Sequence, residues 1–233
     1  DTFTVDGKIP TSIIVDPPNG RMPAMTPKAT QDLMARFANF LRPNDGTAWW
    51  VEKEGPGPYD GPETMAIADR CIFHPEASIP VQPRSYNNLK TIVQTDDHVM
   101  IYIEWMHYAR VVRLADEERK PAHPPADYSA YGGDSIGWWE GDTLVVDTRN
   151  FTDHRSPYQN GIPSGSQKHV VERYTLTEDG TQMVVEFMLE DPEYILEPMT
   201  HTRELIYAPQ ADMSQFNCDL ESTRRFLPQG PVP

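Results

Sequence analysis

Ionisable side chains alternate with large apolar ones along several β-type runs of this sequence. Glu104 and His107 lie close together in one such run, among tyrosine and tryptophan residues. Asp134 opens another run, and His169 lies in a later one. A carboxylate and an imidazole inside an apolar barrel have shifted pKa values and can act as a general acid and base. The pattern therefore predicts proton-transfer chemistry, with Glu104 paired with His107 or His169.

Strict alternation of side chains gives the run around Glu104 two faces. One face carries Tyr102, Glu104 and Arg110, and the other carries Trp105 and His107 unless a bulge intervenes. A structural role is the alternative, because Glu and Arg on strands mostly point to water or pair at a barrel end.

Aromatic residues offer surfaces on which a sugar or another planar ligand could stack. Those near the candidate strands are Tyr86, Trp105, Trp138, Trp139 and Tyr174. The alternative for each of them is a place in the hydrophobic core.

Other catalytic motifs are missing from the sequence. There is no Gly-x-Ser-x-Gly elbow, no phosphate-binding glycine loop and no dinucleotide fingerprint, so hydrolase, kinase and NAD-dependent classes lack support. The seven histidines are scattered, without the spacing of a metal-binding motif. We expect no cofactor and no metal, although a metal held by histidines from different strands stays open.

The chain is strongly acidic, with a net charge of −15 and a pI near 4.8. Nucleic acids and anionic membrane surfaces would repel it, so neither is an expected partner. No apolar run approaches the roughly 20 residues of a membrane-spanning helix. The chain opens on Asp1 rather than methionine, which leads us to expect that a signal peptide has been removed.

The two cysteines, Cys71 and Cys218, are far apart in the sequence. An even count in an acidic, proline-rich chain favours a disulfide and an oxidising compartment. Two buried free thiols are the alternative. A metal site is less favoured, because neither cysteine has a second ligand at suitable spacing.

The 233 residues are expected to form one domain with three parts. Residues 1–88 form an extended arm with a helix from Pro27 to Leu41, a short strand near 12–15 and a second short helix near 62–70. Residues 89–207 form a barrel, and residues 208–233 form a tail.

From Leu89 onward the hydrophobic period changes to two, which is typical of β-strands. The clearest hairpin is Asp134 to Asn150, in which Gly141 supplies the flexible turn position. The eight expected strands cover residues 89–94, 98–104, 107–114, 134–139, 143–150, 168–176, 182–189 and 199–207. Such a series predicts an up-and-down antiparallel barrel or a strongly curved sheet, with the long connections 115–133 and 151–167 as lids at its mouth.

Several motifs follow one another in a fixed order along nearly the whole chain. The pieces are Asp16–Gly20, Arg70-Cys71, Tyr86-Asn87-Asn88 with Ile92–Thr95, Glu104–Arg110, Gly133–Val146, Asn150–Thr152 and His169–Arg173. This series resembles a large family of uncharacterised, exported bacterial proteins. The resemblance implies a lipocalin-like fold and a periplasmic or secreted location, and it implies no particular activity. The chain departs from the family pattern at His98 and in the proline- and histidine-rich connection 115–133.

The resemblance also implies a set of shared polar positions, more than a purely structural barrel requires. We expect Glu104, His107, His169, Tyr86 and Asp134 to be catalytic. The residues expected to bind substrate are Asn87, Asn88, Tyr102, Trp105, Arg110, Trp138, Trp139, Glu172, Arg173 and Tyr174.

Two functions of different classes fit these residues. The first is a cofactor-independent lyase or isomerase, which eliminates, isomerises or cyclises a small organic or glycosidic substrate inside the barrel. The second is a non-catalytic carrier or sensor of an apolar or glycosidic ligand. A protein–protein module is least favoured, and a homo-oligomer stays open.

Overall fold

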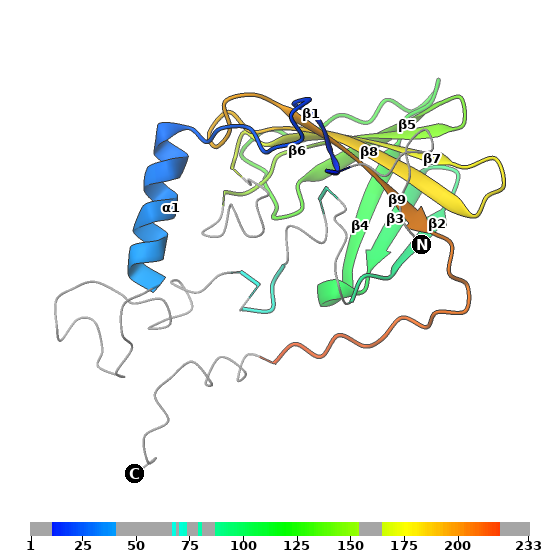
Figure 1. The fold of residues 1–233 in the computed structure, drawn as a ribbon. Coiled ribbons are helices and arrows are strands. Elements are labelled where there is room, and N and C mark those ends of the chain that lie inside the picture. Colours follow the sequence, from blue (N-terminus) through cyan, green and yellow to red (C-terminus); the bar gives the residue numbers. More distant parts are fainter. Residues whose placement is uncertain are drawn as a thin grey trace, which may run out of the picture.

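Nine strands form one strongly curled sheet, which the computed structural model shows as a half-barrel (Figure 1). The structure describes residues 11–40, 67–68, 70–73, 79–80, 87–153 and 165–219. The strand order is β1-β9-β8-β7-β6-β5-β4-β3-β2. The expected fold class, a mainly β lipocalin-like barrel, is confirmed in this curled form.

The bounds of the eight strands from residue 89 onward agree with the period-two pattern to within one residue, and the short β1 begins two residues later than expected. The elements are β1 (Ile14–Asp16), α1 (Pro27–Phe40), β2 (Lys90–Gln94), β3 (His98–Ile103), the 3-10 turn η1 (Trp105–His107), β4 (Tyr108–Leu114), β5 (Asp134–Glu140), β6 (Thr143–Arg149), β7 (His169–Leu176), β8 (Gln182–Glu190) and β9 (Met199–Ile206). The second short helix, expected near 62–70, lies mostly outside the described residues.

The hairpin β5–β6 has the register expected of it. Glu140 pairs with Thr143, and Gly141 takes a φ of +61° in the turn between them. A positive φ suits glycine because it has no Cβ to clash with the backbone.

The contact between β4 and β5 differs from an up-and-down meander because it is parallel. A parallel pair needs a crossover connection, and residues 115–133 supply it. Gly137 makes the close approach possible, since a Cβ at this position would lie 2.7 Å from a methyl group of Val112. Among the described residues, β1 and β2 each pair with one strand only, so the sheet is open rather than closed.

The inner face of the sheet carries two apolar clusters. The first comprises Val99, Ile101, Ile103, Trp105, Val112, Leu114, Leu144, Val146, Tyr174 and Val185, and the second Ile79, Phe151, Val170, Phe187, Leu189, Ile195 and Met199. Burying one large aliphatic or aromatic side chain stabilises a fold by about 1.5–3 kcal/mol. Polar side chains lie among these residues, and they form the candidate site.

Helix α1 begins at a capped N-terminus beside the sheet (Figure 1). The hydroxyl of Thr26 accepts a hydrogen bond from the Ala29 amide and donates one to the carbonyl of Glu193. Pro27 fits the first helical position because its missing N–H has no partner there. In the described part of the chain, no helix has the length and apolar character needed to span a bilayer.

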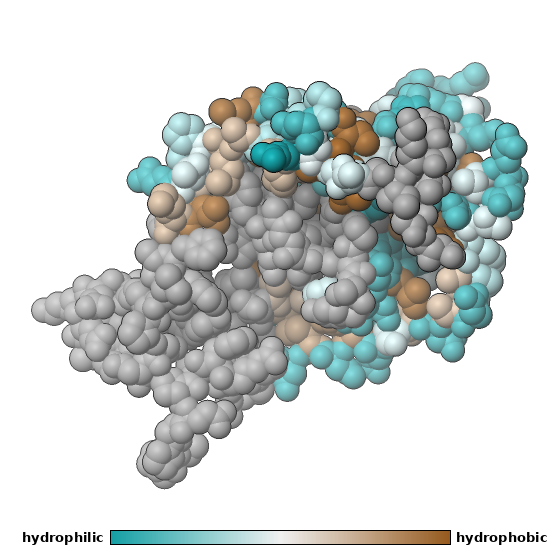
Figure 2. All heavy atoms as spheres, in the orientation of Figure 1, coloured by the Kyte–Doolittle hydropathy of each residue, from teal (hydrophilic) through white to brown (hydrophobic). Residues whose placement is uncertain are grey.

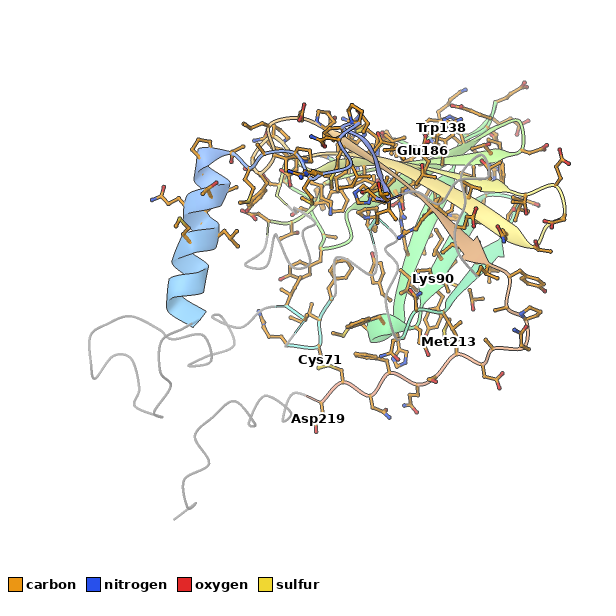
Figure 3. All side chains as sticks on the ribbon, in the orientation of Figure 1. Cys71, Lys90, Trp138, Glu186, Met213 and Asp219 are labelled. Atoms are coloured by element: carbon orange, nitrogen blue, oxygen red, sulfur yellow. A yellow bond between two sulfur atoms is a disulfide. The ribbon has the colours of Figure 1, made fainter. Side chains whose placement is uncertain are left out.

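The segment after β9 turns back beneath the half-barrel and passes η1 (Figure 1). Phe216 packs against the first apolar cluster, and Cys218 forms the expected disulfide with Cys71. In Figure 3, Met213 and Cys71 lie on this lower side, whereas Trp138 and Glu186 lie on the outer side of the sheet. The hairpin ends at the right of Figure 2 are mainly hydrophilic.

Candidate functional site on the inner face of the half-barrel

The inner face carries a buried ion pair between strands that are not neighbours. Arg110 Nη1 on β4 lies 2.6 Å from Glu172 Oε2 on β7, and the side chains are 2% and 0% exposed. The guanidinium also donates hydrogen bonds to the hydroxyls of Ser135 and Thr148, at 3.0 and 2.7 Å. Tyr174 donates to the other oxygen of Glu172 at 2.8 Å. This group, which we call the inner polar network, therefore supplies most of its own hydrogen bonds.

The charges in the inner polar network favour one another. Burial by itself would lower the pKa of Arg110, but the Glu172 carboxylate outweighs this, and the pKa is raised. Burial and the nearby carboxylate also raise the pKa of Tyr174. Arg110 is therefore cationic and Tyr174 a neutral hydrogen-bond donor at neutral pH.

Arg203 and His201 on β9 point to the same inner face but lie outside this network. His201 pairs across the sheet with Phe187, and Arg203 with Val185. Each residue is 5% exposed, and among the described residues no group forms a hydrogen bond with any ring or guanidinium nitrogen of the two. An unpartnered buried polar group carries a desolvation penalty of about 1–3 kcal/mol, and a charged one carries more. Two such groups side by side are an exception to the rule that buried polar groups are hydrogen-bonded.

The surroundings fix the protonation of both residues. Burial, and after it the charge of Arg203, lower the pKa of His201 to about 4, so the imidazole is neutral at neutral pH. Burial lowers the pKa of Arg203 only to about 10, so this side chain remains a cation. The guanidinium lies 5.9 Å from the centre of the Phe187 ring, and the His201 ring lies 4.6 Å from it.

A second pair of buried ionisable residues lies near the start of β7. Lys168 Nζ donates to the Ile79 carbonyl at 3.0 Å and lies 4.6 Å from the centre of the Phe151 ring. Burial lowers the pKa of Lys168 to about 7 and raises the pKa of Asp191 to about 6. One oxygen of Asp191 accepts a hydrogen bond from the Gly165 amide.

A chain of alternating carboxylates and imidazoles runs across the outer face of the sheet. His123 lies 2.8 Å from both Asp134 and Asp147, and His169 lies 2.7 Å from Asp147 and 2.8 Å from Glu190. We call these five residues the outer relay. Arg113 and Arg149 add ion pairs to Asp134 and Asp147.

The connection 115–133 lies on this outer face and is held there by His123. Further hydrogen bonds join Arg113 to the Ala122 carbonyl and Asn150 to the Pro124 carbonyl. The expectation that this connection forms a lid at the barrel mouth is therefore wrong, because its central histidine bonds strand residues that point away from the inner face. The second expected lid, 151–167, lies largely outside the described residues.

The outer relay should make stability depend on pH. The hydrogen bond to Asp147 raises the pKa of His169, against the effect of partial burial. A group with a raised folded-state pKa stabilises the fold fully below its unfolded pKa and loses this effect as the pH rises through the folded value. We therefore expect the relay to stabilise the protein more at about pH 6 than at about pH 9, by about 1.5–3 kcal/mol for one charged hydrogen bond.

Urea unfolding of the wild type and of His169→Gln at both pH values measures this effect. The variant is the necessary control, since Lys168 and Asp191 titrate in the same interval. The free-energy difference between the two proteins should shrink as the pH rises. A difference that is constant or grows with pH would contradict the assignment.

Glu104 and His107 contact the C-terminal tail rather than the outer relay. The Glu104 carboxylate accepts hydrogen bonds from the amides of Leu89 and Ser214, at 3.2 and 2.8 Å. His107 Nε2 accepts one from the Phe216 amide at 2.7 Å. These contacts give both side chains a role in holding the tail, and their expected catalytic role stays a prediction.

The backbone of η1 explains why the expected faces of this run are wrong. Met106 and His107 both have positive φ, at 60° and 50°, so the chain turns between β3 and β4. Arg110 consequently pairs with Ile101 and shares its inner face, while Tyr102 pairs with Ala109 on the outer face. The tail residue Phe216 packs beside Trp105 and His107 at the turn.

The structure brings the expected site residues into several separate groups rather than one. Arg110, Glu172 and Tyr174 form the inner polar network, and Asp134 and His169 belong to the outer relay. Trp138 and Arg173 both bond Glu140 at the end of the β5–β6 hairpin, where Trp139 is 45% exposed. The remaining expected residues lie near β2 and η1, namely Asn87 and Asn88 before β2, Tyr102 stacked on His107, and Trp105 in the core. Tyr86 lies outside the described residues.

Sequence reasoning missed His201 and Arg203, although a signal was present. Along β9 the inward positions are Met199, His201, Arg203 and Leu205, so two ionisable residues replace apolar ones in a regular alternation. The outer-relay residues His123, Asp147 and Glu190 were also missed, because they come from separate segments with no shared spacing.

Fold and inner face together define a lipocalin-like half-barrel with a buried, polar inner site. Comparisons with protein-family models, with curated proteins and with solved structures give no match to this chain. The family resemblance of the sequence motifs therefore remains an expectation, and no activity, ligand or partner carries over from a relative.

Proposed function

We propose that the inner face of the half-barrel binds a small organic molecule and catalyses a cofactor-independent proton transfer on it, as a lyase or isomerase does. One observation carries this proposal: Arg203 and His201 are buried side by side, and in the described part of the structure neither has a hydrogen-bond partner. A fold retains such groups at a cost in stability. A bound molecule would supply the missing partners.

His201 and Arg203 can have different roles in a proton transfer, one as the base and the other as the group that stabilises negative charge. Residues two apart on one strand lie about 7 Å apart, so a molecule of a few atoms spans the gap. The neutral His201 ring would take a proton from a carbon next to a carbonyl group, and the electron pair of that C–H bond would move to the carbonyl oxygen. The Arg203 cation would stabilise the resulting enolate oxygen. Return of the proton to another carbon gives isomerisation, and loss of a leaving group from the adjacent carbon gives elimination.

A carrier function is the second candidate, and the apolar clusters on either side of the site favour it. A ligand between them would be shielded from water without being changed. In either case, the Cys71–Cys218 disulfide supports a protein exported to an oxidising compartment, and we propose a periplasmic or secreted location.

Native mass spectrometry of the protein from its own source tests ligand binding, and deuterium exchange tests chemistry. For the second test, small molecules are extracted from the same source and incubated with the protein in D₂O. Deuterium bound to carbon is then measured by NMR and mass spectrometry. We expect the wild type to bind a ligand and promote exchange. His201→Phe should keep the ligand and lose exchange.

Each other outcome has a defined meaning. A bound ligand that never exchanges or changes supports the carrier function and rules out the enzyme. Exchange that survives in His201→Phe removes His201 from the chemistry. If the protein carries no ligand and changes none of the small molecules in the extract, the proposal is wrong.

A further inference from the structure

The charges on the inner face leave one positive charge without a counter-ion. Arg110 and Glu172 compensate each other in their ion pair. Near the start of β7, Asp191 is the counter-charge of the buried Lys168. His201 is neutral at neutral pH. No ion pair within 4.0 Å joins Arg203 to another described residue. The Glu172 carboxylate acts on Arg203 through its charge, but it already pairs with Arg110 and accepts a hydrogen bond from Tyr174. A ligand with one negative charge would therefore balance this part of the site.

A guanidinium binds carboxylates and phosphates with the same planar fork, which donates two parallel hydrogen bonds. The charge of the anion therefore decides between them. A phosphate dianion brings two negative charges to a single cation, and the nearby Glu172 carboxylate repels it more strongly than it repels a carboxylate with one charge. The charge balance therefore favours a carboxylate.

The hydroxyl groups of the inner polar network are poor partners for a hydroxyl-rich molecule. The Ser135 and Thr148 hydroxyls bond each other and Arg110, and the Tyr174 hydroxyl donates to Glu172. Facing β9 on the inner face are instead the apolar side chains of Val185 and Phe187. This environment disfavours a sugar and favours a ligand with an apolar body.

We propose that the ligand of the inner face is a singly charged organic carboxylate with an apolar body, whose carboxylate pairs with Arg203 and whose body lies along Phe187 between the two apolar clusters. This inference rests on the proposed function, since it names the class of molecule that the same site takes. In this pose His201 faces the part of the body near the carboxylate. If it takes a proton from the carbon next to the carboxylate, the electron pair of that C–H bond moves onto the carboxylate oxygens and gives an enediolate, which Arg203 stabilises.

A panel of four compounds tests the inference by calorimetry and by the rise in melting temperature. The probes are 4-phenylbutyrate, 4-phenylbutanol with the same body but no charge, phenyl phosphate, and methyl glucoside. We expect the carboxylate to bind saturably and the other three to bind at least 10-fold more weakly. In Arg203→Leu, carboxylate affinity should fall by at least about 100-fold, as expected for loss of a two-bond charged pair.

Three controls keep the result interpretable. Circular dichroism verifies that Arg203→Leu folds, which we expect because removing an unpaired buried charge rarely destabilises. Arg203→Lys keeps the charge without the fork and should bind with intermediate affinity. Arg149→Leu removes an exposed arginine from the outer face, where it pairs with Asp147, and should leave binding unchanged.

The outcomes separate this inference from the proposed function. Arg203-dependent binding of phenyl phosphate or methyl glucoside in preference to the carboxylate would overturn the carboxylate class and keep a ligand site. Equal carboxylate binding by the wild type and Arg203→Leu would overturn the pose. If no probe binds but the native protein carries a carboxylate, the inference holds for that molecule. If no probe binds and the native protein carries no ligand, both proposals fail.

Discussion

Glu172→Ala is expected to lower the free energy of unfolding by about 3–5 kcal/mol, enough to unfold much of the protein at physiological temperature. The substitution leaves Arg110 as a cation that is 2% exposed with no ion-pair partner, and it removes the acceptor of the Tyr174 hydroxyl. Loss of one member of a buried ion pair costs far more than the pair contributes, because the other charge stays buried. Urea unfolding followed by circular dichroism measures the change.

Two further variants separate the charge from the loss of volume. Glu186→Ala removes a glutamate on the exposed outer face of β8 and should change stability by no more than about 0.5 kcal/mol. The double variant Arg110→Met with Glu172→Leu removes both charges and should recover most of the lost stability. A double variant as unstable as Glu172→Ala would show that packing, rather than the unpaired charge, explains the effect.

Removing the disulfide is expected to cost about 4–5 kcal/mol by the chain-entropy model. Cys71 and Cys218 are 147 residues apart, so the bond closes a long loop and restricts the unfolded chain strongly. The double variant Cys71→Ser with Cys218→Ser should therefore melt well below the wild type, and the reduced wild type should match it.

Protease sensitivity of the C-terminal tail distinguishes a local effect of the disulfide from a loss of the whole fold. In the serine variant, the Ser214 and Phe216 amides can still bond Glu104 and His107. We expect the sheet to keep its circular dichroism while residues 214–218 become sensitive to proteases. A disulfide variant that is as stable as the wild type and resists cleavage in the tail would contradict this expectation.

Strand positions could be predicted because each strand repeats a local pattern. The run His169 to Leu176 alternates buried and partly exposed residues, and this alternation is visible in the sequence. The parallel β4–β5 contact could not be predicted, because residues 115–133 carry nothing that distinguishes a crossover from a long hairpin loop. The faces of the run around Glu104 were predicted wrongly for a similar reason. Nothing in the residue types of Met106 and His107 indicates the positive φ that turns the chain there.

The candidate site was predicted only in part because its contacts are long-range. Arg110 and Glu172 were both singled out from the sequence, but nothing in their spacing indicates that they form a pair. His123 and Asp147 became visible only when the fold placed them within hydrogen-bond reach. By contrast, His201 and Arg203 occupy positions of β9 where the alternation predicts apolar residues, and this departure is visible in the sequence.

The parallel contact between β4 and β5 divides the sheet into two meanders. Register there involves only Val112 to Leu114 and Ser135 to Gly137, whereas every antiparallel pairing among β2 to β9 is longer. Partial opening of the native sheet should therefore begin along this line and release β2–β4 as a unit. The ion pairs of Arg110 and Arg113 with residues of the second meander cross the same line, so these two arginines hold the two meanders together where the ladder between β2 and β9 is shortest.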